Sequence, residues 1–258
     1  MRESHSESES VANTKALPCF KGRTMKAILF DMDRTLLPMD EELFIKTYFG
    51  GLARKLCPLG VEKEPLIAAI WKATGSMIKN DGSRTNNEVF WQVFAKELNV
   101  DATAFIEASD AFYQKEFYDV KAVTAENPLA MEALKAAREA ADKVVLASQP
   151  IFPMAAQLAR ASFVGLKEED FDLITAYETE SYAKPNPKYY ESICKRLGVE
   201  PKDCLMIGND EKEDMYAASQ AGLNCYLVTD YINAREEYPW DGPRGTFKDM
   251  IEMFKTLK

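Results

Sequence analysis

The chain has 258 residues, 47% of them apolar and 28% charged, which is the composition of a globular protein rather than of a fibrous or disordered one. Its formal net charge of −9 disfavours nucleic acid as a partner, because a phosphate backbone attracts a basic surface. The single histidine, His5, excludes Ser-His-Asp and Cys-His catalysis and histidine-bound metals, so acid–base chemistry must rest on carboxylates, lysine or tyrosine.

Cysteine spacing and hydropathy indicate where the protein works. The five cysteines are widely spaced and form no CxxC pair, which argues against a disulfide framework or a zinc site and favours a reducing, cytoplasmic setting. No apolar stretch approaches the roughly 18 residues that a membrane helix needs, so we expect no membrane partner. Residues 1–24 begin with alternating serine and glutamate and lack the apolar centre of a signal peptide. We expect them either to form a disordered tail outside the fold or to precede a true start at Met25.

From residue 25 onward, short apolar runs alternate with segments of helical periodicity. The apolar runs predict buried strands at 27–30, 143–147, 172–176, 204–207 and 224–228. The segments between the later strands predict helices at 128–140, 152–163, 187–197 and 211–221. This alternation predicts an α/β fold with a parallel sheet that is covered by helices on both faces.

A long insertion separates the first two predicted strands, which end near Asp31 and Ser148, whereas a βαβ unit needs only about 30 residues. Amphipathic segments with capping residues Asp40, Asn87 and Asp101 predict helices there, at 41–56, 64–79, 88–98 and 102–117. We therefore expect an all-helical cap at 38–120, between the two parts of a core at 25–37 and 121–258. Ligands of open α/β sheets bind beyond the carboxyl ends of the strands, so this insertion is placed to act as a lid.

Two aspartates follow the first strand and could carry covalent chemistry. Asp31 stands at the rigid end of the strand and Asp33 two residues later, so both carboxylates can face one pocket. One carboxylate can then attack a substrate while the other moves protons. The alternative is that both residues merely terminate the strand in a turn.

Polar residues follow three of the other predicted strands or lie in the loops after them. Ser148 could bind phosphate oxygens or simply cap the next helix. Lys184, between prolines, could neutralise an anion or remain solvated. Asp210 and Asp214 could gather negative charge that a bound cation relieves, or complement a helix dipole.

Together these four motifs, in this order, resemble those of the haloacid dehalogenase-like (HAD) hydrolase superfamily, in its phosphatase type with a helical cap inserted after the first motif. The resemblance implies a Rossmann-like core and magnesium-dependent hydrolysis of a small phosphomonoester, a phosphorylated metabolite. It implies that Asp31 is the nucleophile, which forms an aspartyl-phosphate, and that Asp33 is the acid–base catalyst. It implies that Ser148 and Lys184 bind the phosphoryl group, and that Lys184 also steadies Asp31.

The resemblance further implies a Mg²⁺ site and additional contacts to substrate. Its metal ligands would be Asp31, the backbone carbonyl of Asp33 and Asp210, with Asp214 in support. Thr35 and Gln149 would join the substrate-binding set. Two residues depart from the family pattern: Arg34 stands where glycine is usual, and Gln149 where asparagine is usual.

Three readings compete with a phosphatase. A dehalogenase needs no proton donor two residues after its nucleophile, so Asp33 disfavours that reaction. A sugar-phosphate mutase shares both carboxylates, and a catalytically silent sensor would bind a phosphometabolite without turnover.

The aromatic residues of the insertion are predicted to form its own core, although one could line the substrate pocket: Trp71, Phe90, Trp91, Phe94, Phe105 and Phe112.

Overall fold

The computed structural model describes residues 20–257 and has a parallel β-sheet at its centre. Within these residues the sheet has six strands in the order β3-β2-β1-β4-β5-β6. Their bounds are β1 Met25–Phe30, β2 Ala141–Leu146, β3 Leu173–Ile174, β4 Cys204–Gly208, β5 Asn224–Val228 and β6 Arg244–Gly245. Phe30 at the end of β1 pairs with Leu146 on β2 and Ile207 on β4, so these three strands end at one level. The predicted parallel α/β fold is confirmed.

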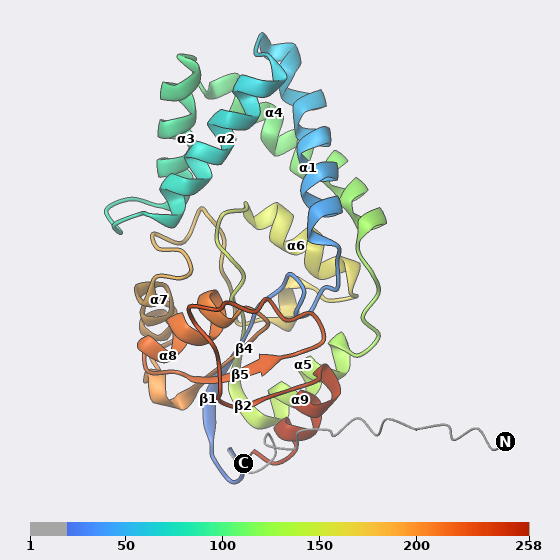
Figure 1. The fold of residues 1–258 in the computed structure, drawn as a ribbon, viewed down its shortest axis with the longest axis vertical. Coiled ribbons are helices and arrows are strands. Elements are labelled where there is room, and N and C mark those ends of the chain that lie inside the picture. Colours follow the sequence, from blue (N-terminus) through green and yellow to red (C-terminus); the bar gives the residue numbers. More distant parts are fainter. Residues whose placement is uncertain (1–19, 258) are drawn as a thin grey trace, which may run out of the picture.

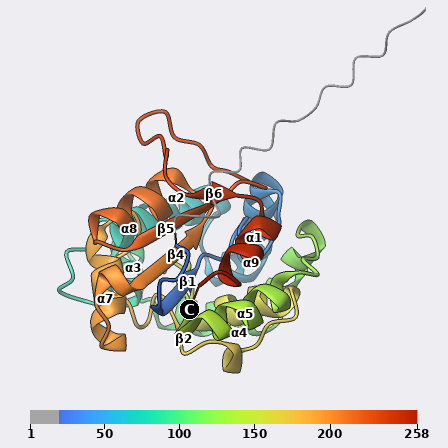
Figure 2. The same ribbon diagram turned by 90° about the horizontal axis from the view of Figure 1, so that it is seen from below.

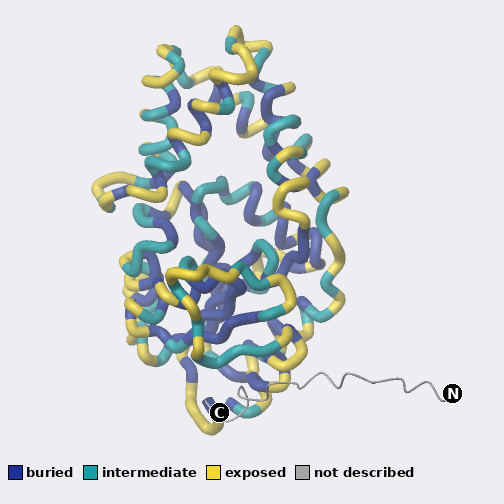
Figure 3. Tube along the Cα trace, viewed as in Figure 1, coloured by how far each residue is buried: buried dark blue, intermediate teal, exposed yellow. Residues whose placement is uncertain are grey.

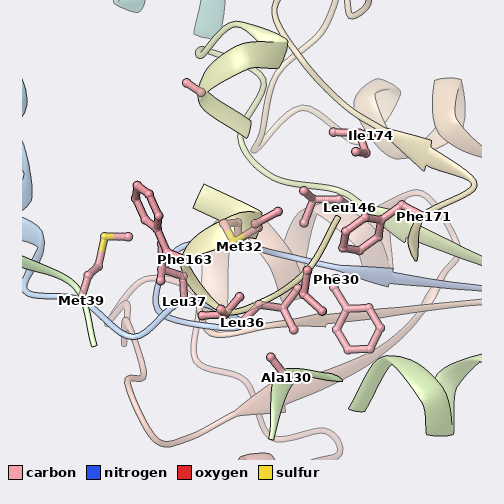
Figure 4. Close-up of a cluster of buried hydrophobic side chains, with 14 of the residues drawn as sticks. Phe30, Met32, Leu36, Leu37, Met39, Ala130, Leu146, Phe163, Phe171 and Ile174 are labelled. Carbon is pink, nitrogen blue, oxygen red and sulfur yellow. The ribbon is translucent and has the colours of Figure 1, made fainter. Parts of the chain in front are cut away.

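Helices cover both faces of the sheet, because alternate side chains of its strands point to opposite sides. Ile28 and Phe30 of β1 join one buried cluster, whereas Ala27 and Leu29 join the other. Figure 2 shows α5 and α9 on one face and α7 and α8 on the other. Figure 4 shows Phe30 in the first cluster, to which buried residues of α6 also belong. These helices are α5 Ala130–Ala140, α6 Met154–Phe163, α7 Pro187–Leu197, α8 Ala217–Gln220 and α9 Phe247–Phe254.

Four helices of the insertion stand over the edge of the sheet where the strands end (Figure 1). They are α1 Glu41–Leu56, α2 Lys63–Ile78, α3 Asn86–Leu98 and α4 Thr103–Gln114, with short 3₁₀ turns at Cys57–Leu59 and Glu116–Val123. In Figure 1, α2 and α3 pack side by side as one arm, and α1 and α4 form the other. Figure 3 shows exposed residues at the outer ends of these helices and buried residues along them.

Local capping explains where these helices begin. The Asp40 side chain accepts a hydrogen bond from the Leu43 amide at 3.0 Å, so α1 starts where the sequence predicts it. The third helix begins earlier than expected, because Thr85 and Glu88 form a capping box and Thr85 replaces Asn87 as the cap. Helix α4 ends at Gln114 rather than at 117, and the chain continues as a 3₁₀ turn.

Two further differences concern the ends of the chain. Part of the predicted tail, residues 20–24, belongs to the fold: Phe20 is 5% exposed, and the Gly22 amide donates to the Thr256 carbonyl at 3.1 Å. Residues 1–19 lie outside the described range. The sequence analysis missed β6, because a two-residue strand leaves no readable periodicity, and it also missed the eight-residue helix α9. Between residues 20 and 257, no helix has the length and apolarity to cross a lipid bilayer.

Candidate active site

The residues that follow β1, β2 and β4 meet at one edge of the sheet. The Asp31 amide donates to the Ile207 carbonyl at 2.9 Å, and the Ala147 amide donates to the Phe30 carbonyl at 2.7 Å, so the parallel pairing continues past the strand ends. A cavity of about 380 Å³ lies between this edge and the helical insertion. The carboxylates of Asp31, Asp33, Asp210 and Asp214 are among the groups that line it. Four predicted acids thus share one cavity.

Lys184 lies between two of these carboxylates. Its Nζ atom is 2.8 Å from Asp31 Oδ1 and 2.6 Å from Asp214 Oδ1, and its side chain is fully buried. Burial opposes the charged form, but the neighbouring Asp214 and Asp31 carboxylates raise the pKa of Lys184 well above 10.5. The ammonium group therefore stays charged and bridges the first and fourth motifs.

The fourth motif is a tight turn closed by its own acids. Asp214 Oδ2 accepts hydrogen bonds from the Asn209 and Asp210 amides at 3.0 and 3.1 Å. A Cβ atom on Gly208 would overlap the Asp214 carboxylate, so only glycine fits there. Asp210 Oδ1 accepts from two amides of the following π-helix, Glu211–Tyr216, while its Oδ2 accepts from Asn233 and from Arg235 at 2.9 Å.

Asp33 has a partner that the sequence analysis did not identify. Arg160, fully buried on α6, forms an ion pair with Asp33 Oδ2 and stacks on the Phe152 ring at 4.5 Å. Burial raises the pKa of Asp33, Arg160 opposes this rise, and the Asp31 charge adds to it. The only sequence signal for Arg160 is an arginine in the apolar stripe of a helix, among Ala156, Ala159 and Phe163.

Three other predicted site residues have different surroundings. The Thr35 hydroxyl donates to Asn209 Oδ1 at 3.2 Å, so Thr35 connects the first and fourth motifs and does not line the cavity. Ser148 does not line it either, and its buried hydroxyl has no hydrogen-bond partner within residues 20–257. Gln149 lines the cavity; its side chain accepts from the Lys184 amide at 2.9 Å and donates to the Lys184 carbonyl at 3.0 Å. Gln149 thereby holds the segment that carries Lys184.

Arg34 occupies a backbone conformation that favours glycine. Its φ angle is 64°, in the left-handed region, and its guanidinium lies 3.2 Å from Glu41 Oε2 and 3.4 Å from the Ile232 carbonyl. The departure from the family motif therefore puts both backbone strain and a cation at the cavity.

The oxygen atoms at this edge suit a magnesium ion. Mg²⁺ is commonly held by one or two carboxylates together with water and substrate oxygens, and Asp31 and Asp210 line the same cavity. Asp31 Oδ2 has no hydrogen-bond partner among the described residues. No group of three or more histidine, cysteine or acidic side chains arranged to hold a metal occurs in residues 20–257.

The insertion supplies the other wall of the cavity. Of the six aromatic residues predicted to form its core, four line the cavity: Trp71, Phe90, Trp91 and Phe94. Phe105 and Phe112 are buried away from it. The insertion therefore contributes a largely apolar wall opposite the acidic edge of the sheet.

Comparison with known proteins agrees with this geometry. A model of the haloacid dehalogenase-like hydrolase family matches residues 25–222. Phosphoglycolate phosphatase 1 of Pseudomonas aeruginosa is 24% identical over 226 residues, which cover 83% of this chain and 73% of that protein. The crystal structure of a HAD phosphatase from Thermococcus onnurineus has a TM-score of 0.58 at 23% identity, covering 90% of this chain and 99% of that one.

Similarity of fold alone does not distinguish the chemistry. A 2-haloacid dehalogenase from Pseudomonas syringae also has a TM-score of 0.58, at 15% identity over 90% of this chain and 99% of that one. The family match is more informative, because it runs from the first strand to beyond α8 and contains all four motifs. The protein belongs to the haloacid dehalogenase-like hydrolases.

Proposed function

We propose that this hydrolase cleaves a small phosphomonoester, with Mg²⁺ as its cofactor and an aspartyl-phosphate on Asp31 as its intermediate. The observation that carries the proposal is the contact of Lys184 Nζ with both Asp31 and Asp214 at the end of the sheet. A fixed cation beside a carboxylate nucleophile offsets the repulsion that an anionic phosphate would meet. The relative from Pseudomonas aeruginosa, a phosphoglycolate phosphatase, supports a small phosphate ester as substrate.

The first step forms the covalent intermediate. Asp31 attacks phosphorus with the carboxylate oxygen that Lys184 does not bind, and the bond from phosphorus to the ester oxygen breaks. The departing oxygen keeps the electron pair of that bond and takes a proton from Asp33. Although Ser148 does not line the cavity, its buried hydroxyl has no hydrogen-bond partner within residues 20–257, and in this proposal it donates to a phosphoryl oxygen of the bound substrate.

The second step releases phosphate. Asp33, now a carboxylate, removes a proton from water, whose oxygen attacks phosphorus as the bond to Asp31 breaks. At the end Asp31 is again a carboxylate and Asp33 again carries a proton, and Arg160 keeps Asp33 in place through its contact with Oδ2. A bound Mg²⁺, held by Asp31, the Asp33 carbonyl and Asp210, would supply positive charge to the phosphoryl oxygens. Asp214 supports the site by holding Lys184 and the amides of the fourth motif.

We further propose that residues 38–120 act as a cap and that 25–37 and 121–258 form the catalytic core. A cap of this size excludes water from the aspartyl-phosphate until the alcohol has left. The presence of Asp33 two residues after the nucleophile favours phosphoryl transfer over dehalogenation, since only the former needs a proton for its leaving group.

The proposal is tested by measuring phosphate release from a panel of phosphate esters with and without Mg²⁺. We expect turnover that EDTA abolishes, with one phosphate released for each alcohol; a mutase would release none. Asp31→Asn should lower kcat by about 10³-fold or more and Asp33→Asn by about 10²- to 10⁴-fold. Asp142→Asn, the same change at an exposed site outside the cavity, is the control and should keep wild-type activity. Full turnover by Asp31→Asn would refute the intermediate.

A further inference from the structure

We infer that the alcohol part of the substrate is apolar, an alkyl or aryl group rather than a sugar, a polyol or a carboxylic acid. The inference rests on the proposed function, because it concerns the part of the same cavity that lies beyond the reacting phosphate. It starts from the contrast between the two walls. The sheet edge contributes carboxylates, whereas the cap contributes mainly aliphatic and aromatic side chains.

The apolar wall is built from one face each of α1 and α2, with aromatic side chains of α3. Ile45, Tyr48 and Phe49 of α1 lie three and four residues apart, which places them on one side of that helix. Ile70 and Trp71 face the same cavity from α2. An amphipathic helix normally buries such a face in a protein core, but here these faces line an open space.

Part of this wall remains exposed to water. Trp71 is 51% exposed although its ring lies 5.1 Å from that of Phe49, and Ile78, about two turns further along α2, is 36% exposed. Leaving large apolar side chains in water forgoes the free energy that their burial would release. A ligand with an apolar surface would cover them and recover it.

Charges in the cavity oppose an anionic alcohol part. Among the described residues that line it, Arg34 is the only lysine or arginine, and it already pairs with Glu41. Glu213 adds another acid to the same lining. A carboxylate or a second phosphate on the substrate would therefore lie near acids, with no unpaired lysine or arginine to bind it among the described lining residues.

On the cap side of the cavity, hydroxyl-rich groups also find few hydrogen-bond partners. The charged or hydroxyl-bearing side chains that the cap helices contribute are Glu41, Tyr48, Thr74, Ser109 and Tyr113. Glu41 already pairs with Arg34, and the two tyrosine hydroxyls bond to each other at 2.6 Å. Each sugar hydroxyl buried without a partner would weaken binding. The volume of about 380 Å³ is near the lower end for ligand pockets and accommodates a small alcohol part.

The test uses straight-chain alkyl phosphates from methyl to hexyl phosphate, whose primary alcohols are comparable leaving groups. We expect kcat/KM of the wild-type enzyme to rise about three- to fourfold for each methylene that the cavity covers. Propyl phosphate should exceed glycerol 1-phosphate, which has the same number of carbons, by about tenfold or more. Equal or higher kcat/KM for glycerol 1-phosphate, or no rise along the series, would overturn the inference.

Two variants locate the effect in the cap. Trp71→Ala should lower the ratio of kcat/KM for hexyl over methyl phosphate by about tenfold. Leu43→Ala removes a comparably exposed side chain, 46% exposed on α1 outside the cavity, and should leave that ratio unchanged. An unchanged ratio in Trp71→Ala would contradict the inference. If the wild-type enzyme turned over no ester at all, the proposed function would fail as well, whereas uniform turnover of every ester would reject the apolar preference alone.

Discussion

Arg34 shows how one residue of the first motif can be both strained and useful. A left-handed backbone conformation raises the free energy of the folded state for any residue that has a Cβ atom. Glycine does not have this cost. We expect Arg34→Gly to be more stable than Arg34→Ala by about 1 kcal/mol, because both lose the contact with Glu41 but only glycine relieves the strain. For a chain of this length the difference corresponds to about 2–4 °C in Tm. Equal Tm values for the two variants would show that the backbone there is unstrained.

The residues of the four motifs could be located from the sequence because most of them stand at or just after the ends of apolar strands. Parallel pairing then brings Asp31, Ser148 and Asp210 to one edge, whatever the rest of the chain does. Arg160 could not be located in this way. It lies inside a helix, and its ion pair with Asp33 joins residues 127 positions apart, a contact that only the packing of α6 on the sheet creates.

At the level of elements, long helices and central strands were predictable and short irregular ones were not. Helices 41–56 and 187–197 and strand 224–228 have the predicted bounds. The predicted helix 211–221 is instead a π-helical turn followed by four α-helical residues. At the start of the π-helix, the amides of Lys212 and Glu213 donate hydrogen bonds to the Asp210 carboxylate. Apolar periodicity in the sequence does not encode this arrangement.

That turn depends on the glycine at the end of β4. A methyl group on Gly208 would displace the Asp214 carboxylate from the two amides that it accepts from and from Lys184. We therefore expect Gly208→Ala to lower the free energy of unfolding by about 2–3 kcal/mol and kcat by about 10²-fold or more.

Gly75→Ala is the matched control, since a Cβ in that helix meets no atom within 4 Å. It should keep full activity and gain up to about 1 kcal/mol. Wild-type kcat in Gly208→Ala would refute this role.

For the whole molecule, the sequence indicated a helical insertion but not how it rests on the core. One contact between the two is made by Asn86, a fully buried residue whose amide donates to the Glu180 carbonyl at 2.8 Å. Its side chain donates to the carbonyls of Pro150 and Tyr182 at 3.1 and 3.3 Å and accepts from Asn80 at 2.8 Å. These core loops adjoin Gln149 and Lys184, so one residue of the insertion contacts the two segments that carry them. Nothing in the helical periodicity of the cap identifies such a contact, because it depends on loop carbonyls far along the chain.

Removing this side chain should loosen the cap without unfolding the core. We expect Asn86→Ala to lower kcat/KM by about tenfold or more, because the loops that carry Gln149 and Lys184 lose their contacts with the cap. Hydrogen exchange at the Asn86 and Asn87 amides should accelerate by about 10- to 100-fold, because buried carbonyls of the core loops lose their hydrogen bonds to the cap. Exchange in β1 should stay unchanged. Asn87→Ala is the matched control, since the Asn87 Oδ1 atom has no hydrogen-bond partner within residues 20–257. If exchange accelerated equally in β1, Asn86 would stabilise the entire fold rather than the docking of the cap.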